Sequence, residues 1–114
     1  MQTQAILFTD RQRATLTDAT VPDPGPGEVI VETAFSCVSP GTELRCLAGA
    51  QPDGLPFPFI PGYSLAGHVI ARGTDVDLAV GAPVFASGTI ASTPPRMWGG
   101  HVRHALCRAA DVVP

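Results

Sequence analysis

Within residues 35–73 of this sequence, six polar or charged side chains are expected near chain corners. The order of residue types there predicts a strand, a tight turn, a short helix and a returning strand. Corners between such elements can turn several side chains toward one ligand. The side chains that we expect to converge in this way are Ser39, Thr42, Glu43, Arg45, Tyr63 and Ser64.

The cysteines and histidines do not form a metal-binding pattern. Cys37, Cys46 and Cys107 include no C-x-x-C pair, and their odd number argues against a disulfide framework. We therefore expect three reduced and largely buried thiols. His101 and His104 are three residues apart on an expected strand, so they would face opposite sides and could not chelate one ion together.

Most of the elements that must position these residues are predicted strands. Two strands are expected over residues 4–9 and 13–21, the second at a sheet edge. The linker at residues 22–27 is rich in Pro and Gly and cannot pair in a sheet. Residues 28–38 give the strongest strand pattern. That pattern puts Cys37 on the same face as Val29, so Cys37 is expected in the core.

The turn at Pro40 and Gly41 leads into a predicted short helix that Gly49 can end. Thr42 is the expected N-cap, and Glu43 then lies in the first turn, where the helix dipole favours an acid.

A proline-rich surface loop is expected over residues 50–61, anchored to the core by Phe57 and Phe59. Further strands are expected over residues 63–72 and 99–106.

The composition indicates a single small domain of 114 residues. The net charge is −3 and the seven basic residues, all Arg, are scattered, which argues against nucleic-acid binding. No apolar run approaches the roughly 20 residues of a membrane span, and no secretory leader is visible. We therefore expect a cytoplasmic protein. Twelve Gly and twelve Pro favour a mostly β fold with many turns.

Two segments resemble motifs of a known family. Residues 37–43 read C-V-S-P-G-T-E and residues 58–69 read P-F-I-P-G-Y-S-L-A-G-H-V. They are similar to C-G-x-C-G-T-D and P-x-x-x-G-H-E-x-x-G-x-V in the N-terminal catalytic domain of the zinc-type alcohol dehydrogenases, the medium-chain dehydrogenase/reductase superfamily. The resemblance covers essentially the whole chain. It implies that residues 1–114 form one GroES-like, partly open β-barrel with one short helix and long Pro/Gly-rich loops.

The resemblance also implies that no zinc is bound in the family's way. Pro40 stands where the family has a zinc cysteine, and Tyr63 stands where it has a zinc histidine. A catalytic zinc needs three protein ligands, so that site cannot be built here. His68 follows Gly67, but the spacing from Pro61 makes Gly62 the family's glycine, so His68 is expected to be an ordinary strand residue.

Catalytic roles are implied for Thr42 and Tyr63. Thr42 holds the position of the family hydroxyl that relays a proton between substrate and nicotinamide ribose, although capping the helix would account for it equally well. The Tyr63 hydroxyl could stabilise negative charge on a substrate oxygen and deliver a proton, in place of zinc. The alternative is that Tyr63 only fills the vacated metal pocket.

Other residues are expected to contact substrate or cofactor. Arg45 stands at the end of the family's relay and stays protonated, so it would bind ribose or phosphate oxygens or remain solvated. Glu43 would lie behind the site or balance Arg45. The substrate is expected between the Pro40-Gly41 turn, the Tyr63-Ser64 corner and the loop at Trp98. The full set expected to contact substrate or cofactor is Ser39, Pro40, Gly41, Glu43, Arg45, Ser64 and Trp98.

In the family the chain continues into a Rossmann domain, and its G-x-G-x-x-G fingerprint is absent here. The resemblance therefore implies the substrate domain of a zinc-independent oxidoreductase. NAD or NADP would be bound mainly by a Rossmann domain of the same polypeptide, and this segment alone would be inactive. The S-P-G-T-E segment is most similar to the corresponding segment in branches of the family that act on larger carbonyl or tetrapyrrole-like compounds. The expected partners are a small-molecule substrate and the Rossmann domain, with a homodimer as a further option and no nucleic acid or membrane. The alternative is a non-catalytic binding module on the same barrel, since fold alone does not confer function.

Overall fold

The computed structural model describes residues 1–50 and 56–114, so part of the expected loop, residues 51–55, lies outside the described residues. Within the described part, no helix has the length and apolar character needed to cross a bilayer. The elements in chain order are β1 (Gln2–Asp10), β2 (Arg13–Thr20), β3 (Glu28–Ser36), α1 (Pro40–Leu47), β4 (Leu65–Arg72), β5 (Pro83–Ala86), β6 (His104–Arg108) and a 3-10 turn (Ala109–Asp111).

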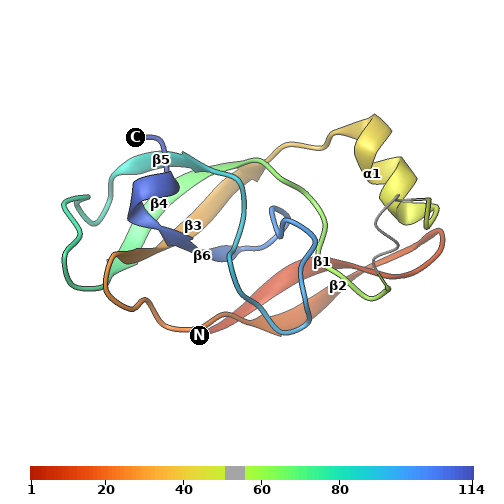
Figure 1. Cartoon of the computed structure of the whole chain (residues 1–114), viewed down its shortest axis with the longest axis horizontal. Coiled ribbons are helices and arrows are strands. Elements are labelled where there is room, and N and C mark those ends of the chain that lie inside the picture. The colour runs from red at the N-terminus through yellow and green to blue at the C-terminus, as the bar shows by residue number, and fades with distance from the viewer. Residues whose placement is uncertain (51–55) are drawn as a thin grey trace.

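The strands form two antiparallel sheets. β1 and β2 make a hairpin, and the larger sheet has the order β5-β4-β3-β6. Single bridges such as Ala5 with Val102 tie the hairpin to the segment before β6. Figure 1 shows α1 at one end of the molecule beside the hairpin, and the C-terminus at the other end. Over the described residues, the expected mostly β fold with one short helix and partly open sheets is confirmed.

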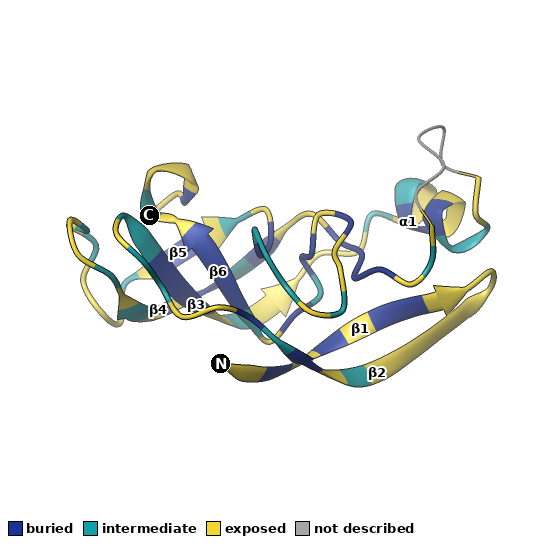
Figure 2. Ribbon diagram, turned by 60° about the horizontal axis from the view of Figure 1, so that its bottom comes forward, coloured by how far each residue is buried: buried dark blue, intermediate teal, exposed yellow. Residues whose placement is uncertain are grey.

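The core lies between the hairpin and the larger sheet. Ala5, Leu7 and Ala19 of the hairpin pack against the inner face of the sheet, where Val29 and Val31 are fully buried. Figure 2 shows this inner face as a band of buried residues along β3, β4 and β6. Burying one such aliphatic side chain contributes about 1.5–3 kcal/mol, so this face holds the two sheets together.

β3 does not keep the strict alternation expected from its sequence. Its register with β4 shifts between Ile30 and Val31 and again between Thr33 and Phe35. Val29 and Val31 pack in the cluster between the sheets and Ile30 packs in a separate cluster, so β3 is buried on both faces there, whereas Phe35, beyond the second shift, is 78% exposed. The expectation that Cys37 is a core residue is wrong, because β3 ends at Ser36 and Cys37 is exposed.

α1 begins one turn earlier than its residue types suggest. The N-cap is Ser39, and Pro40 at the first helical position has its φ fixed for a helix. Thr42 therefore lies inside the helix, and the prediction that it is the N-cap is wrong. The predicted end is confirmed, since Gly49 takes up φ +72, a left-handed conformation that glycine adopts without strain.

The predicted anchors of the loop before β4 are confirmed. Phe59 is buried, and its ring lies 5.8 Å from Phe8 and 5.1 Å from Phe57, centroid to centroid. Cys46 of α1 and Met97 complete this second apolar cluster. The cluster fixes the helix against the hairpin.

Two strand boundaries differ from expectation, and both differences bear on the site. β4 begins at Leu65, so Tyr63 and Ser64 lie at the corner before it. β6 begins at His104, so the strand expected from residue 99 starts later and His101 precedes it. The two histidines are therefore not neighbours on one strand.

Candidate functional site

A buried carboxylate, Glu43, is the centre of the polar network at this end of the barrel. The residue is 6% exposed and projects from the first turn of α1. Its Oε2 accepts the backbone N–H of Ser39 at 2.6 Å, and its Oε1 contacts Nε2 of His101 at 2.5 Å. One acid thus stabilises the start of the helix and fixes an imidazole ring.

The second nitrogen of His101, Nδ1, contacts the Ser36 hydroxyl at 2.7 Å. The backbone on either side of the ring is held as well. The His101 N–H donates to the carbonyl of Pro61 at 3.0 Å, and its carbonyl accepts the N–H of Ile6 at 2.9 Å. Both ring nitrogens and both backbone groups therefore have partners, which leaves the ring little freedom.

Gly62 makes room for this ring. A Cβ built on Gly62 would lie 2.7 Å from Cδ2 and 2.8 Å from Nε2 of His101. Gly62 also has φ +90, and its carbonyl accepts the N–H of Gly100 at 2.7 Å. Only glycine fits this position without moving the imidazole.

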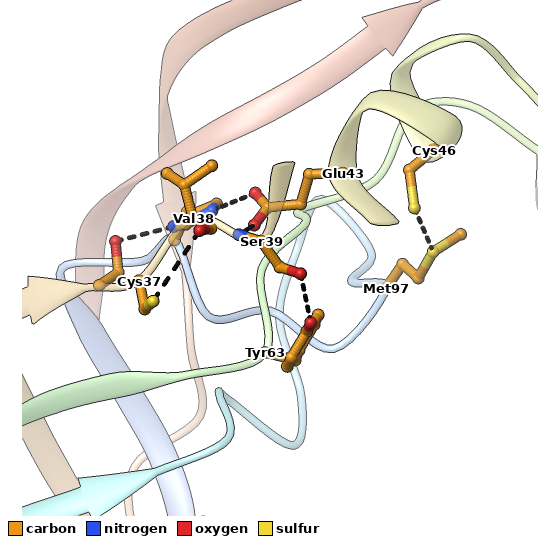
Figure 3. A network of polar contacts seen from close by, with 9 residues as sticks. Cys37, Val38, Ser39, Glu43, Cys46, Tyr63 and Met97 are labelled. Carbon is orange, nitrogen blue, oxygen red and sulfur yellow. Dashed lines mark hydrogen bonds and ion pairs between the residues drawn. The ribbon is translucent and has the colours of Figure 1, made fainter. Parts of the chain in front are cut away.

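Tyr63 forms a second polar contact beside the carboxylate. Its hydroxyl donates to Oγ of Ser39 at 2.5 Å, and Figure 3 shows the two side chains pointing toward each other below Glu43. Its ring packs edge-on against Trp98 with centroids 5.3 Å apart. Tyr63 is 39% exposed, so this phenol is held in place and remains accessible to a ligand.

A mostly apolar groove of about 450 Å³ opens between α1 and β1, and we call it the α1–β1 groove. Its polar groups come from Ser36, Glu43 and His101, so the network described above forms one part of its wall. Pockets with apolar walls and a few fixed polar groups are typical of small-molecule sites. The apolar lining consists of Ile6, Phe8, Val38, Pro40, Leu44 and Leu47.

The structure brings several of the predicted site residues together. Ser39 bonds both partners, since its Oγ accepts from Tyr63 and its backbone N–H donates to Glu43, and Trp98 packs against the tyrosine. Pro40 lines the α1–β1 groove. Their catalytic or binding roles remain predictions.

The other predicted residues lie at the margins of this network. Gly41 and Thr42 lie in the first turn of α1, and Arg45 is exposed in its last turn. Ser64 is exposed, and its carbonyl accepts the N–H of Cys37 at 2.9 Å.

Sequence reasoning missed Ser36 and His101. Ser36 looked like one more strand position, and His101 was expected on a strand with His104. The glycines could have indicated this site, because Gly62 directly precedes Tyr63 and the Gly99-Gly100 pair directly precedes His101. Clustered glycines mark close approaches of backbone and side chain, and the imidazole passes Gly62 at such an approach.

The donor groups at the family's zinc positions do not fit a zinc ion. Pro40 has no side-chain donor, and the Tyr63 hydroxyl is directed at Ser39. Across residues 1–50 and 56–114, no three His, Cys, Asp or Glu side chains converge on one point. The polar groups at this corner are instead directed at one another.

The three thiols lie in different surroundings. Cys37 is exposed, while Cys46 and Cys107 are buried, and none of the three forms a disulfide. Burial raises the pKa of the Cys107 thiol to about 12, with a smaller contribution from the negative charge of Asp111. Cys46 packs with its Sγ 3.5 Å from Sδ of Met97 (Figure 3). The buried thiols therefore serve packing, since the thiolate is the reactive form of cysteine.

Residues 25–114 match the family described as the alcohol dehydrogenase GroES-like domain. The chain is 33% identical over 90 residues to 2-desacetyl-2-hydroxyethyl bacteriochlorophyllide A dehydrogenase of Rhodobacter capsulatus, which covers 77% of this chain and 29% of that protein. It is 36% identical over 94 residues to D-altritol 5-dehydrogenase of Agrobacterium fabrum, which covers 77% of this chain and 27% of that protein. An alcohol dehydrogenase superfamily protein from Novosphingobium aromaticivorans has a similar structure, with a TM-score of 0.80 and 30% identity over 96% of this chain and 33% of that one. The chain thus spans less than a third of the length of these relatives.

Proposed function

This chain belongs to the alcohol dehydrogenase GroES-like domain family, and on that premise we propose that it is the substrate domain of a zinc-independent, NAD(P)-dependent oxidoreductase. The reaction would interconvert an alcohol and a carbonyl, or reduce a conjugated alkene. The dinucleotide would be held mainly by a Rossmann domain of the same polypeptide, in the cytoplasm. A bound nicotinamide supplies the carbon that accepts or donates the hydride.

The observation that carries this proposal is the position of the Tyr63 hydroxyl, which donates to Oγ of Ser39, while the backbone N–H of Ser39 donates to Glu43. Tyr63 stands where the family has a zinc ligand, and its phenol is fixed by Ser39 and by Trp98. Hydride transfer to a carbonyl leaves negative charge on oxygen, and a positioned hydroxyl stabilises that charge by hydrogen bonding. We infer that Tyr63 takes the place of the metal, its hydroxyl hydrogen turning from Oγ of Ser39 to the substrate oxygen when substrate is bound.

The substrate class is supported by the names of the relatives. The name of the Rhodobacter capsulatus protein includes a hydroxyethyl group on a bacteriochlorophyllide, and the name of the Agrobacterium fabrum protein is that of a polyol dehydrogenase. Both names therefore include an alcohol. The largely apolar α1–β1 groove suits the apolar part of the first compound better than the second. We assign a secondary alcohol on a large, apolar carbon skeleton as the substrate class.

Substitution of Tyr63 by Phe in the complete enzyme tests this function. The change removes one hydroxyl and leaves the ring against Trp98, so folding should be retained. Removing one hydrogen-bond donor to a developing oxyanion typically costs 10²- to 10³-fold in kcat, so kcat should fall by about 10²-fold with little change in KM. If kcat stays within about twofold of the parent enzyme, Tyr63 does not stabilise the charge on the substrate oxygen. Stoichiometric zinc in the purified protein would contradict the metal-free proposal.

A non-catalytic binding module is the second candidate. The loss of donors at Pro40 and the accessible apolar groove would suit such a module equally well. Absence of any NADH- or NADPH-linked turnover, together with tight binding of an apolar ligand, would favour it.

A further inference from the structure

We propose that Ser36, His101 and Glu43 form a proton relay for a hydroxyl or carbonyl oxygen of a ligand in the α1–β1 groove. This inference deepens the proposed function and rests on it for the hydride step. Ser36 would contact the ligand, His101 would hold the proton, and Glu43 would position the imidazole. The three residues come from β3, from the segment before β6 and from α1, so only the folded chain brings them together.

The hydrogen bonds of Glu43 determine the tautomer of His101. A carboxylate can only accept, so the hydrogen between Oε1 and the imidazole belongs to Nε2. In the neutral ring, Nδ1 is then the acceptor and receives the Ser36 hydroxyl hydrogen at 2.7 Å. Ser36 is thereby aligned to pass a proton inward as its oxygen takes one from a ligand.

Burial decreases from the acid to the serine, which gives the relay a direction. The side chains of Glu43 and His101 are 7% and 8% exposed, while Ser36 is an exposed residue at the end of β3. The imidazolium formed by proton uptake would sit directly against the carboxylate, and such pairing stabilises the charged ring. A charged neighbour in the adjoining hollow is Arg103, whereas the residues that β1 and β3 contribute to that hollow, among them Gln4, Ile6 and Ser36, are uncharged.

The proton balance of the step is simple. During oxidation of a bound secondary alcohol, its carbon loses a hydride to the oxidised nicotinamide and its hydroxyl proton passes to Oγ of Ser36. The proton of Ser36 moves to Nδ1 of His101. The products are a ketone, a reduced nicotinamide and an imidazolium paired with Glu43, and reduction runs in reverse.

A spectroscopic test needs no turnover. Substitution of Glu43 by Gln keeps the shape, but its amide would donate to Nε2, so the ring hydrogen should move to Nδ1 and Ser36 would lose its acceptor. Long-range ¹H–¹⁵N spectra of the ring should show hydrogen on Nε2 in the parent chain and on Nδ1 in Glu43→Gln. Hydrogen on Nδ1 in the parent chain would overturn the relay.

Ligand contact is tested with acetophenone, an aromatic ketone whose carbonyl can accept the Ser36 hydroxyl. Titration into the chain should shift the His101 ring signals in a saturable way. Ser36→Ala should abolish that ring shift, and Leu44→Asp should weaken binding, because Leu44 is 62% exposed and lines the groove. No ring shift at saturating ketone would overturn the proposal.

Turnover separates this inference from the proposed function. In the complete enzyme, Ser36→Ala should lower kcat for 1-phenylethanol oxidation by about 10²-fold, and Ser36→Thr should restore most of it. Thr15→Ala is the control: it removes another exposed hydroxyl, which donates to the backbone carbonyl of Leu16, and it should leave kcat unchanged. A parent enzyme with full turnover and an unimpaired Ser36→Ala variant would refute the relay alone. Ring shifts without NAD(P)-linked turnover by the parent would refute the proposed function and leave the groove site standing.

Discussion

Replacing Gly62 with Ala adds one methyl group at the most crowded point of the site. The position has φ +90, and a non-glycine residue in the left-handed region costs about 1–2 kcal/mol. The new Cβ would also lie 2.7 Å from the ring of His101, so the imidazole must move. Moving it breaks the bonds to Ser36 and Glu43, which contribute roughly 1 and 1.5–3 kcal/mol. We therefore expect a total loss of about 3–6 kcal/mol.

Gly81→Ala is the matched control for this substitution. Gly81 has φ +93, and a Cβ built there meets nothing within 4 Å. Urea unfolding followed by circular dichroism and Trp98 fluorescence should give a loss of about 1–2 kcal/mol for Gly81→Ala, the backbone cost alone. The difference between the two variants then measures the displacement of His101.

The double variant completes the argument. In a His101→Ala background the methyl group meets no ring, so Gly62→Ala should cost only about as much as Gly81→Ala. Equal losses for Gly62→Ala and Gly81→Ala in the parent chain, within about 0.5 kcal/mol, would refute the claim that the glycine exists to admit the imidazole.

Three further predictions concern the core and the thiols. Because the pKa of the Cys107 thiol is raised from 9.0 to about 12 in the folded chain, the unfolded chain releases this proton first. The protonated thiol therefore makes its full contribution to the free energy of unfolding below pH 9. Between pH 9 and 12 the free energy of unfolding should fall by about 1.4 kcal/mol per pH unit. Unfolding curves measured across this range should show a smaller slope for Cys107→Ala. Iodoacetamide should alkylate Cys37 in the native chain and leave the other two thiols unmodified, as mass spectrometry would show; native labelling of Cys46 would contradict the burial. Phe59→Ala should cost about 3–5 kcal/mol in urea unfolding, because it removes the ring that joins Phe8 to Phe57, and a loss below about 1 kcal/mol would contradict this.

The parts of the fold that local chemistry determines could be predicted from the sequence. The strands β1 and β2, the glycine that ends α1 and the phenylalanine anchors all follow from neighbouring residues, and each was confirmed. The family motifs added the barrel and the convergence of Ser39 with Tyr63.

Two of the errors arose where distant segments set the geometry, and the third, the cap of α1, arose from two competing local preferences. The placement of Cys37 depends on register shifts between β3 and β4, which an alternating pattern does not reveal. The cap of α1 fell on Ser39 because Pro40 suits the first helical position, which outweighed the preference of Thr42 for a cap. The contact of His101 with Glu43 joins residues 58 positions apart, and no local pattern encodes it.

α1 has eight residues, a length that does not persist as an isolated helix in water. Its attachments include the contact of Glu43 with His101 and the packing of Cys46 on Met97. Leu44 and Leu47 of the same helix form one side of the groove. Docking of the helix and completion of the pocket are consequently a single equilibrium. A molecule in which α1 is undocked lacks the groove, so the apparent affinity for a ligand scales with the fraction of molecules in which α1 is docked.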